Sequence, residues 1–293
     1  MKKKAPKRYE KWLKNNASPM AGKHVLITGA NSGIGYAAAE HLLSLGARVT
    51  LCCRSAARGE AARNALQAAF PHAQIALESL DLSSFASIDG FCQKQKEQNA
   101  AVDVLLHCAG VYYPRESLTA DGLPTTVGVN YEGTRRLTEG LLPLMNENGR
   151  VIFTTSLVDR FGKVQRQGAH RGGYRDYAES KLLLSAYAWQ KAAQRGEKEP
   201  LFIAAHPGIT ATSLLDPAKT THSPLFSRLG HAFLYLFTHA KEKAALTAVL
   251  AAAGDVKNGD CIGPRGIFGI SGYPHRTKFC RNVKKHVKKQ QPS

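Results

Sequence analysis

The stretch TGANSGIG, residues 28–35, decides the fold because it joins two segments of different periodicity. The run HVLIT (24–28) is apolar and predicts a buried β-strand, whereas GIGYAAAEHLLSLG (33–46) has the spacing of a helix that stops at Gly46. A glycine-rich turn between a first strand and the following helix is the arrangement of nucleotide-binding α/β domains. Our starting hypothesis is that this turn approaches a phosphate group.

The three glycines of the turn have different expected roles. Gly29 permits a tight turn, Gly33 removes a side chain where a pyrophosphate would come close, and Gly35 lets the helix pack near the strand. The N–H groups of the helix N-terminus would then face the phosphate. The spacing is T-G-x-x-x-G-x-G, and its place after the first strong strand favours nucleotide binding over a purely structural turn.

The alternation of strand and helix patterns continues along the chain. Apolar runs predict strands at 24–28, 47–53, within 73–82, and at 102–110, 149–156 and 201–208. Helical patterns occupy 33–46, 56–70, 85–98, 123–146 and 177–195. Near-continuous apolar strands separated by helices indicate a parallel sheet covered on both faces. We predict a single-domain α/β fold of the Rossmann type, with a doubly wound parallel sheet of about seven strands.

The chain has 293 residues and a formal net charge of +18, and most of this excess lies near its ends. Residues 1–14 contain seven lysines and arginines against Glu10, and residues 276–289 contain seven with no acidic residue. We predict a basic N-terminal tail at 1–20, a nucleotide-binding domain at 21–275 and a basic C-terminal tail at 276–293. Solvated tails are favoured over peripheral contact with an anionic membrane. Nucleic-acid binding ranks behind both.

Other sequence features argue against a secreted or metal-dependent protein. The six cysteines contain no C-x-x-C pair, which favours free thiols in a reducing compartment. No apolar leader follows the lysine-rich start, so a cytoplasmic location is expected. His107, His170 and His206 lie on separate elements without ligand spacing, and no metal site is predicted.

The residue that ends the second strand is expected to select the nucleotide. An acidic side chain there would bind the ribose hydroxyls of NAD. LCCRS instead places Arg54 at this edge, where a guanidinium suits a 2′-phosphate. We therefore predict a preference for NADPH, the alternative being that Arg54 is only a surface charge.

YAESK places Tyr177 and Lys181 at positions i and i+4, on one face of a helix. A nearby ammonium favours tyrosinate and would lower the pKa of the phenol toward a useful range for proton transfer. Ser156 follows the fifth predicted strand, at the sheet edge where ligands bind in such folds. Each feature alone is common, but together they indicate acid/base chemistry.

Four motifs in this order resemble the short-chain dehydrogenase/reductase family, most closely its retinol dehydrogenase-related branch. They are TGANSGIG, VGVNYEGT, YAESK with the upstream Ser156, and HPGITAT, within a likeness running from about 23 to 253. The resemblance implies oxidation of an alcohol or reduction of a carbonyl, with Tyr177 as general acid/base. It also implies that Lys181 holds the nicotinamide ribose, that Ser156 orients the substrate and that Asn130 supports a water relay.

The same resemblance implies a cofactor site built from many segments. Asp81 matches a residue near the adenine, and the segment around Pro207 matches one beside the nicotinamide. The predicted cofactor-binding residues are Gly29, Asn31, Ser32, Gly33, Ile34, Gly35, Arg54, Asp81, Leu82, Ala109, Gly110, Tyr177, Lys181, Pro207, Gly208 and Thr212.

The sequence departs from the family pattern at two places. Cys108 stands where an asparagine is usual, which bears on local cofactor geometry because a thiol makes weaker hydrogen bonds. The interval between Ser156 and Tyr177 is also long, and its insertion (159–176) predicts a basic rim loop. A solvated loop is favoured over a site for an anionic substrate.

The segment 210–238 matches the substrate lid of the family, and its aromatic content predicts a lipophilic substrate unless these residues pack on the core. By analogy, the helices at 123–146 and 177–195 would pair copies into a homodimer or homotetramer. The alternative to an enzyme is a non-catalytic NADPH-binding regulatory or scaffold protein. An intact Ser–Tyr–Lys set favours the enzyme.

Overall fold

The computed structural model describes residues 5–113, 115–165, 169–170, 172–208, 240–266, 269–278 and 281–290. Thr212 and the predicted lid at 210–238 lie outside these residues. None of the helices in the described part of the chain is long and apolar enough to cross a bilayer.

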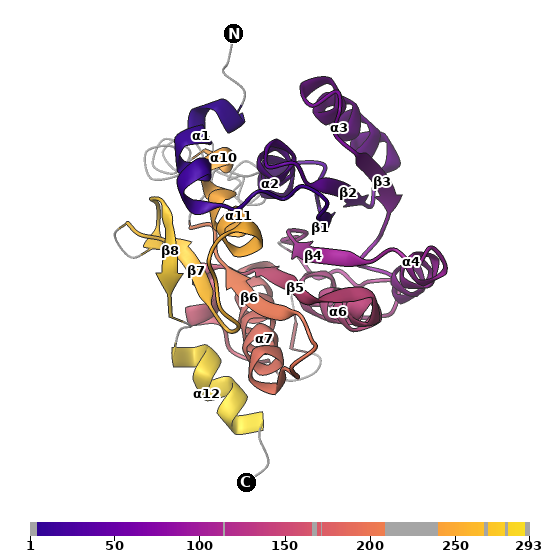
Figure 1. Cartoon of the computed structure of the whole chain (residues 1–293). Coiled ribbons are helices and arrows are strands. Elements are labelled where there is room, and N and C mark those ends of the chain that lie inside the picture. The colour runs from indigo at the N-terminus through magenta and orange to yellow at the C-terminus, as the bar shows by residue number, and fades with distance from the viewer. Residues whose placement is uncertain are drawn as a thin grey trace, which may run out of the picture.

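The described residues build an eight-stranded sheet in the order β3-β2-β1-β4-β5-β6-β7-β8 (Figure 1). The strands are β1 (His24–Thr28), β2 (Arg48–Cys53), β3 (Ile75–Ser79), β4 (Val102–His107), β5 (Met145–Thr154), β6 (Leu201–Ala205), β7 (Cys261–Pro264) and β8 (Pro274–Thr277). Strands β1 to β7 pair in parallel, and β8 joins β7 antiparallel. The winding reverses between β1 and β4, which is where ligands bind in open α/β sheets. The predicted doubly wound sheet is confirmed, with one strand more than expected.

Helices cover both faces of this sheet. The α-helices are α1 (Ala5–Asn16), α2 (Gly33–Ser44), α3 (Ala56–Ala69), α4 (Phe85–Glu97), α5 (Thr125–Val127), α6 (Thr134–Leu141), α7 (Gly173–Gln194), α10 (Lys241–Ala244), α11 (Leu246–Ala253) and α12 (Arg281–Gln290). The described residues also form a π-helical segment (Gly128–Gly133) and the 3₁₀ segments Leu142–Leu144 and Leu157–Phe161. Helices α2 and α11 share one apolar cluster with one side of β1, and α4, α6 and α7 share another with the opposite side. The sheet is therefore buried on both faces, as its apolar strands require.

The helix predicted at 123–146 is wrong at its C-terminal end. The structure ends it at Leu144 and starts β5 at Met145, which pairs with Val102 of β4. Pro143 provides no backbone donor inside a continuing helix, which is consistent with the break here. Neither β7 nor β8 had a predicted range, because each is a four-residue run that contains a proline and has little apolar alternation.

The described parts of both terminal segments form helices that pack on the protein, whereas we expected solvated tails. On α1, Tyr9 and Leu13 are only 4% exposed and belong to the core cluster that includes α2 and α11. On α12, Val283 and Val287 are buried against α7 beside Trp189. Lysines of these segments therefore lie on helices that pack on the protein; they include Lys11, Lys14, Lys284 and Lys285.

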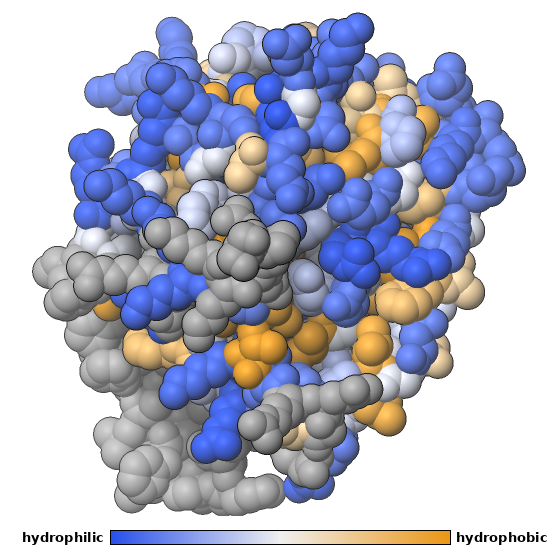
Figure 2. Space-filling view, turned by 90° about the horizontal axis from the view of Figure 1, so that it is seen from below, coloured by the Kyte–Doolittle hydropathy of each residue, from blue (hydrophilic) through white to orange (hydrophobic). Residues whose placement is uncertain are grey.

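The surface seen from below in Figure 2 is mainly hydrophilic, with smaller hydrophobic areas between the polar side chains. Lys284 and Lys285 of α12 are among the exposed residues of the molecule. The basic character predicted for the C-terminal segment thus remains on the surface, although the helix that carries it is anchored.

Candidate functional site

In the glycine-rich turn, neighbouring backbone segments pack too closely for side chains to fit between them. Gly29 has a φ of +66°, and a Cβ on it would lie 2.8 Å from the Cα of Ala109. A Cβ on Gly35 would lie 2.6 Å from the carbonyl oxygen of Gly29, so the helix packs directly on the turn. Gly33, the first residue of α2, has a φ of +58°, and no atom lies within 4 Å of the position that a Cβ would take there. A helix N-terminus beside an open glycine suits a phosphate, so the turn fits a nucleotide.

A cavity of about 920 Å³ lies at the carboxyl ends of β1, β2, β4 and β5, in front of this turn. The predicted site residues that line it are Gly29, Asn31, Ser32, Gly33, Ile34, Gly35, Arg54, Asp81, Leu82, Ala109, Gly110, Ser156, Tyr177, Lys181, Pro207 and Gly208. Asn130 does not line it, and Thr212 lies outside the described residues. One cavity therefore joins the glycine-rich turn to the Ser–Tyr–Lys set.

A second arginine accompanies Arg54 at the end of β2. Arg58, on the first turn of α3, lines the same cavity, and both side chains are exposed. Ser55 caps this helix by accepting a hydrogen bond from the backbone N–H of Arg58 at 3.4 Å. Sequence reasoning missed Arg58, although its place in the first turn of the predicted helix, close to Arg54, was a usable signal.

Tyr177 is buried in α7 with its hydroxyl close to Ser156. Burial raises the pKa of Tyr177 to about 12, and the hydrogen bond with Ser156 opposes this shift. The lowered pKa that we predicted from a neighbouring ammonium is therefore wrong for this arrangement. The Lys181 nitrogen lies 5.9 Å from the centroid of the Tyr177 ring.

Lys181 instead donates a hydrogen bond to the backbone carbonyl of Thr154 at 2.9 Å. Burial lowers the pKa of Lys181 to about 8, with nearby Cys108 and Asp159 opposing the shift. The Cys108 thiol accepts a hydrogen bond from the hydroxyl of Thr154 at 3.5 Å, and burial raises its pKa to about 11. Cys108 is therefore a neutral neighbour of the lysine, not a competing anion.

Asn130 lies in the π-helical segment, behind the cavity wall. Its side-chain oxygen accepts from the N–H of Val111 at 2.8 Å, and its amide nitrogen donates to the carbonyl of Val111 at 2.9 Å. The same nitrogen donates to the hydroxyl of Ser180 at 3.0 Å. Asn130 thus ties the loop after β4 to α7, and π-helical turns of this kind often mark functional sites.

The cavity wall around Tyr177 is largely apolar and aromatic. Tyr112 packs edge-on against Tyr177 with ring centroids 5.9 Å apart, and Leu157, Phe161 and Tyr174 also line this end. Phe161 and Tyr174 are strongly exposed, so they stand at the rim. Phe161 and Tyr174 were missed because an insertion without periodic structure does not reveal which side chains face inward.

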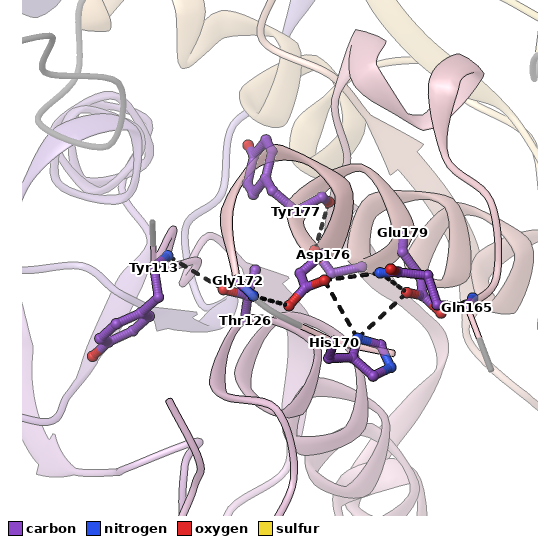
Figure 3. Close-up of polar contacts among 9 residues, drawn as sticks. Tyr113, Thr126, Gln165, His170, Gly172, Asp176, Tyr177 and Glu179 are labelled. Carbon is purple, nitrogen blue, oxygen red and sulfur yellow. Dashed lines mark hydrogen bonds and ion pairs between the residues drawn. The ribbon is translucent and has the colours of Figure 1, made fainter. Parts of the chain in front are cut away.

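The insertion is attached to α7 by a compact polar cluster, shown in Figure 3. Gln165 donates from its side chain to Asp176 at 2.8 Å and to Glu179 at 2.9 Å. The ring nitrogen Nδ1 of His170 lies 3.5 Å from Asp176 and 3.6 Å from Glu179. The ring of Tyr177 points away from this cluster in Figure 3. The described part of the insertion is therefore fixed beside the site, which its charge pattern alone did not indicate.

Known proteins of one family resemble this chain in sequence. The family model of short chain dehydrogenases matches residues 23–222. Mouse "Retinol dehydrogenase 14" is 33% identical over 266 residues, covering 83% of this chain and 79% of that protein. Human "Retinol dehydrogenase 12" is 32% identical over 232 residues, covering 77% of this chain and 72% of that protein.

Solved structures show the same fold. An uncharacterised protein from Mycobacterium paratuberculosis superposes with a TM-score of 0.73 at 26% identity, covering 92% of this chain and 90% of that one. The Pseudomonas aeruginosa RhlG/NADP complex has a TM-score of 0.61 at 24% identity, covering 80% of this chain and 90% of that one. The second likeness carries the fold alone.

Proposed function

Because the chain belongs to the short-chain dehydrogenase family, we propose that it is an NADP(H)-dependent oxidoreductase with Tyr177 as its general acid/base. The family acts on alcohols or carbonyl compounds with a nicotinamide cofactor. The observation that carries the finer proposal is that Ser156, Tyr177 and Lys181 line the same cavity as the glycine-rich turn.

The side chains divide the chemistry between them. A bound nicotinamide supplies or accepts the hydride. In reduction, the Tyr177 hydroxyl donates its proton to the substrate oxygen, and in oxidation the phenolate takes it back. Ser156 hydrogen-bonds Tyr177 and holds the substrate oxygen beside it. We retain the ribose contact for Lys181 and the water relay for Asn130 as parts of this proposal.

The preference for NADP(H) rests on Arg54 and Arg58. Both line the cavity at the end of β2, where a 2′-phosphate would lie. Two guanidinium groups favour a phosphate over a hydroxyl through charge-assisted hydrogen bonds.

A lipophilic substrate is supported by the apolar wall around Tyr177 and by relatives named retinol dehydrogenases. We propose a hydrophobic alcohol or aldehyde, with the lid at 210–238 contributing to its selection. The same proposal includes a cytoplasmic location and peripheral membrane contact through the basic segments. It also includes the domain boundaries and pairing into a homodimer or homotetramer.

The decisive experiment compares wild-type protein with Tyr177→Phe in two assays. The first measures NADPH oxidation with a long-chain aldehyde and with a short polar ketone. The second measures NADPH binding by nucleotide fluorescence. We expect turnover of the long-chain aldehyde to fall by about 10²–10⁴-fold in the variant, with NADPH affinity changed by less than about threefold.

The non-catalytic alternative predicts different results. A regulatory or scaffold protein would bind NADPH without consuming it, and Tyr177→Phe would then change neither assay. Equal turnover by the variant would remove Tyr177 from the acid/base role, and faster reaction of the polar ketone would count against a lipophilic site.

A further inference from the structure

We propose that His170, Asp176 and Glu179 form a binding site for a divalent transition-metal ion of the Zn²⁺ type, outside the cofactor cavity. One ligand atom from each of the three lies within 4.8 Å of the other two. In Figure 3 they converge with Gln165 on the side of α7 turned away from the ring of Tyr177.

The first argument is charge. The carboxylates of Asp176 and Glu179 are each only 3% exposed. Among the described residues, no lysine or arginine lies within ion-pair distance of either one, and their partners are Gln165, His170 and the backbone N–H of Gly172. None of these partners carries a permanent positive charge. Buried charges in proteins are paired or coordinate metals, and a divalent ion would neutralise both carboxylates at once.

The second argument is distance. Nδ1 of His170 lies 3.5 Å from Oδ1 of Asp176 and 3.6 Å from Oε2 of Glu179. These separations are long for N–H···O hydrogen bonds, which have a mode of about 2.9–3.0 Å. Ligands held tetrahedrally at about 2.0–2.2 Å from a zinc ion lie about 3.3–3.6 Å from one another. The imidazole is therefore spaced from the carboxylates as a co-ligand would be.

Gln165, and a water molecule in a small neighbouring cavity, would provide further oxygen ligands. The Gln165 side-chain nitrogen donates to the carboxylates of both Asp176 and Glu179. Rotating the amide by half a turn would turn its oxygen toward the proposed ion instead. A cavity of about 10 Å³ adjoins His170 and Asp176, and Thr125 and Thr126 are among the polar residues that line it. That volume is about what one water molecule needs. Nitrogen and oxygen ligands of this mixture suit Zn²⁺ or a similar ion.

The site would have a clear mechanical consequence. Gln165 and His170 lie in the part of the insertion that precedes α7, whereas Asp176 and Glu179 lie on α7 on either side of Tyr177 in the sequence. An ion bound to all of them would fasten the described part of the rim to the helix that presents Tyr177. Metal binding and folding are coupled in such sites, so the ion would add stability.

The test uses the full chain, freed of any affinity tag and stripped with a chelator. Zn²⁺ is titrated calorimetrically, and Co²⁺ is titrated while visible absorption is recorded, because Co²⁺ in a low-coordinate N/O site gives characteristic bands. We expect one ion per chain and a rise in thermal midpoint that grows with Zn²⁺ concentration. If the stripped protein neither binds the ion nor gains stability, the proposal is overturned. The four side chains would then form only a hydrogen-bonded cluster.

Variants show whether binding occurs at this cluster. Asp176→Asn and Glu179→Gln keep the side-chain shape, and His170→Ala removes the nitrogen ligand. Each should weaken Co²⁺ binding by about tenfold or more and abolish the visible bands. His72→Ala and Glu60→Gln are matched surface controls that should bind like wild type. If the cluster variants bind Co²⁺ as tightly as the controls, the site is elsewhere and the proposal fails, whatever the NADPH assays show.

Discussion

The side-chain nitrogen of Lys181 and the carbonyl oxygen of Thr154 are 2.9 Å apart, which joins helix α7 to the last residue of β5. Lys181 is 4% exposed, and no described carboxylate lies within ion-pair distance of it. A pKa lowered from 10.5 to about 8 means that burying the ammonium at neutral pH costs roughly 3 kcal/mol of stability. The lost hydrogen bond in a variant would cost only about 1 kcal/mol.

Lys181→Met should therefore be more stable than wild type and nearly inactive. We expect a gain of about 1–2 kcal/mol in the free energy of unfolding at pH 7, with turnover reduced by about 100-fold or more. Because the native pKa is depressed, wild-type stability should rise with pH between 8 and 10.5, by about 1.4 kcal/mol per unit, as the native ammonium loses its proton first. Urea unfolding across this range measures both effects. A variant that is less stable, or that retains this alkaline rise, would show that the buried ammonium is not the cause.

Arg54 and Arg58 predict a separable effect on nucleotide choice. Arg54→Ala and Arg58→Ala should each weaken NADPH binding by about tenfold to 100-fold, because a charged hydrogen bond contributes about 1.5–3 kcal/mol. NADH binding should stay nearly unchanged. Arg63→Ala is the matched control, since Arg63 lies on α3 together with Arg58 but pairs with Glu60 at 2.8 Å. Equal losses for NADPH and NADH would exclude selection of the 2′-phosphate by these two arginines.

The sequence was most informative where function and local backbone geometry coincide. The turn around Gly29 and Gly35 could be predicted because only glycine fits its φ value and its close approaches. Tyr177 and Lys181 could be paired because helical spacing fixes which residues share a face. These rules are local, and they were enough to predict that the glycine-rich turn, Tyr177 and Lys181 belong to one site.

Features set by tertiary packing were not predictable in the same way. Tyr9 and Leu13 lie in a lysine-rich segment whose charge conceals the apolar stripe that α1 buries. The contact of His170 with Asp176 joins an irregular loop to a helix, and no periodicity encodes it. The raised pKa of Tyr177 likewise depends on burial, which the spacing of YAESK does not specify.

Gly35 offers a direct test of the glycine-rich turn. In Gly35→Ala, the new Cβ would lie 2.6 Å from the Gly29 carbonyl, so α2 must move away from the turn. We expect a loss of about 1–3 kcal/mol in unfolding free energy and weaker NADPH binding. Gly90→Ala on α4 is the control, because no atom lies within 4 Å of its Cβ position. That change should stabilise the protein by about 0.5–1 kcal/mol. Parallel urea unfolding and nucleotide titration compare the two, and unchanged stability in Gly35→Ala would contradict the close packing.

His107 at the end of β4 predicts how the protein responds to acid. It is 2% exposed, stacks on Phe153 and shares a 2.9 Å hydrogen bond with the hydroxyl of Thr138. Burial lowers the pKa of His107 to about 3, so the native state keeps it neutral where the unfolded chain, with a pKa of 6.5, already binds a proton. Stability should therefore be lost as pH falls from 6.5 toward 3, by about 1.4 kcal/mol per unit from this residue.

His107→Gln retains a hydrogen-bonding partner for Thr138 but cannot take up the proton. Its unfolding free energy, measured in urea between pH 6.5 and 4.5, should fall less steeply than that of wild type, by the equivalent of about one proton. Part of the slope should remain, because burial also lowers the pKa of His206 to about 4. His72→Gln on the surface should keep the full wild-type slope. If His107→Gln also kept it, the acid sensitivity would have to come from other buried groups, with His206 the first to replace.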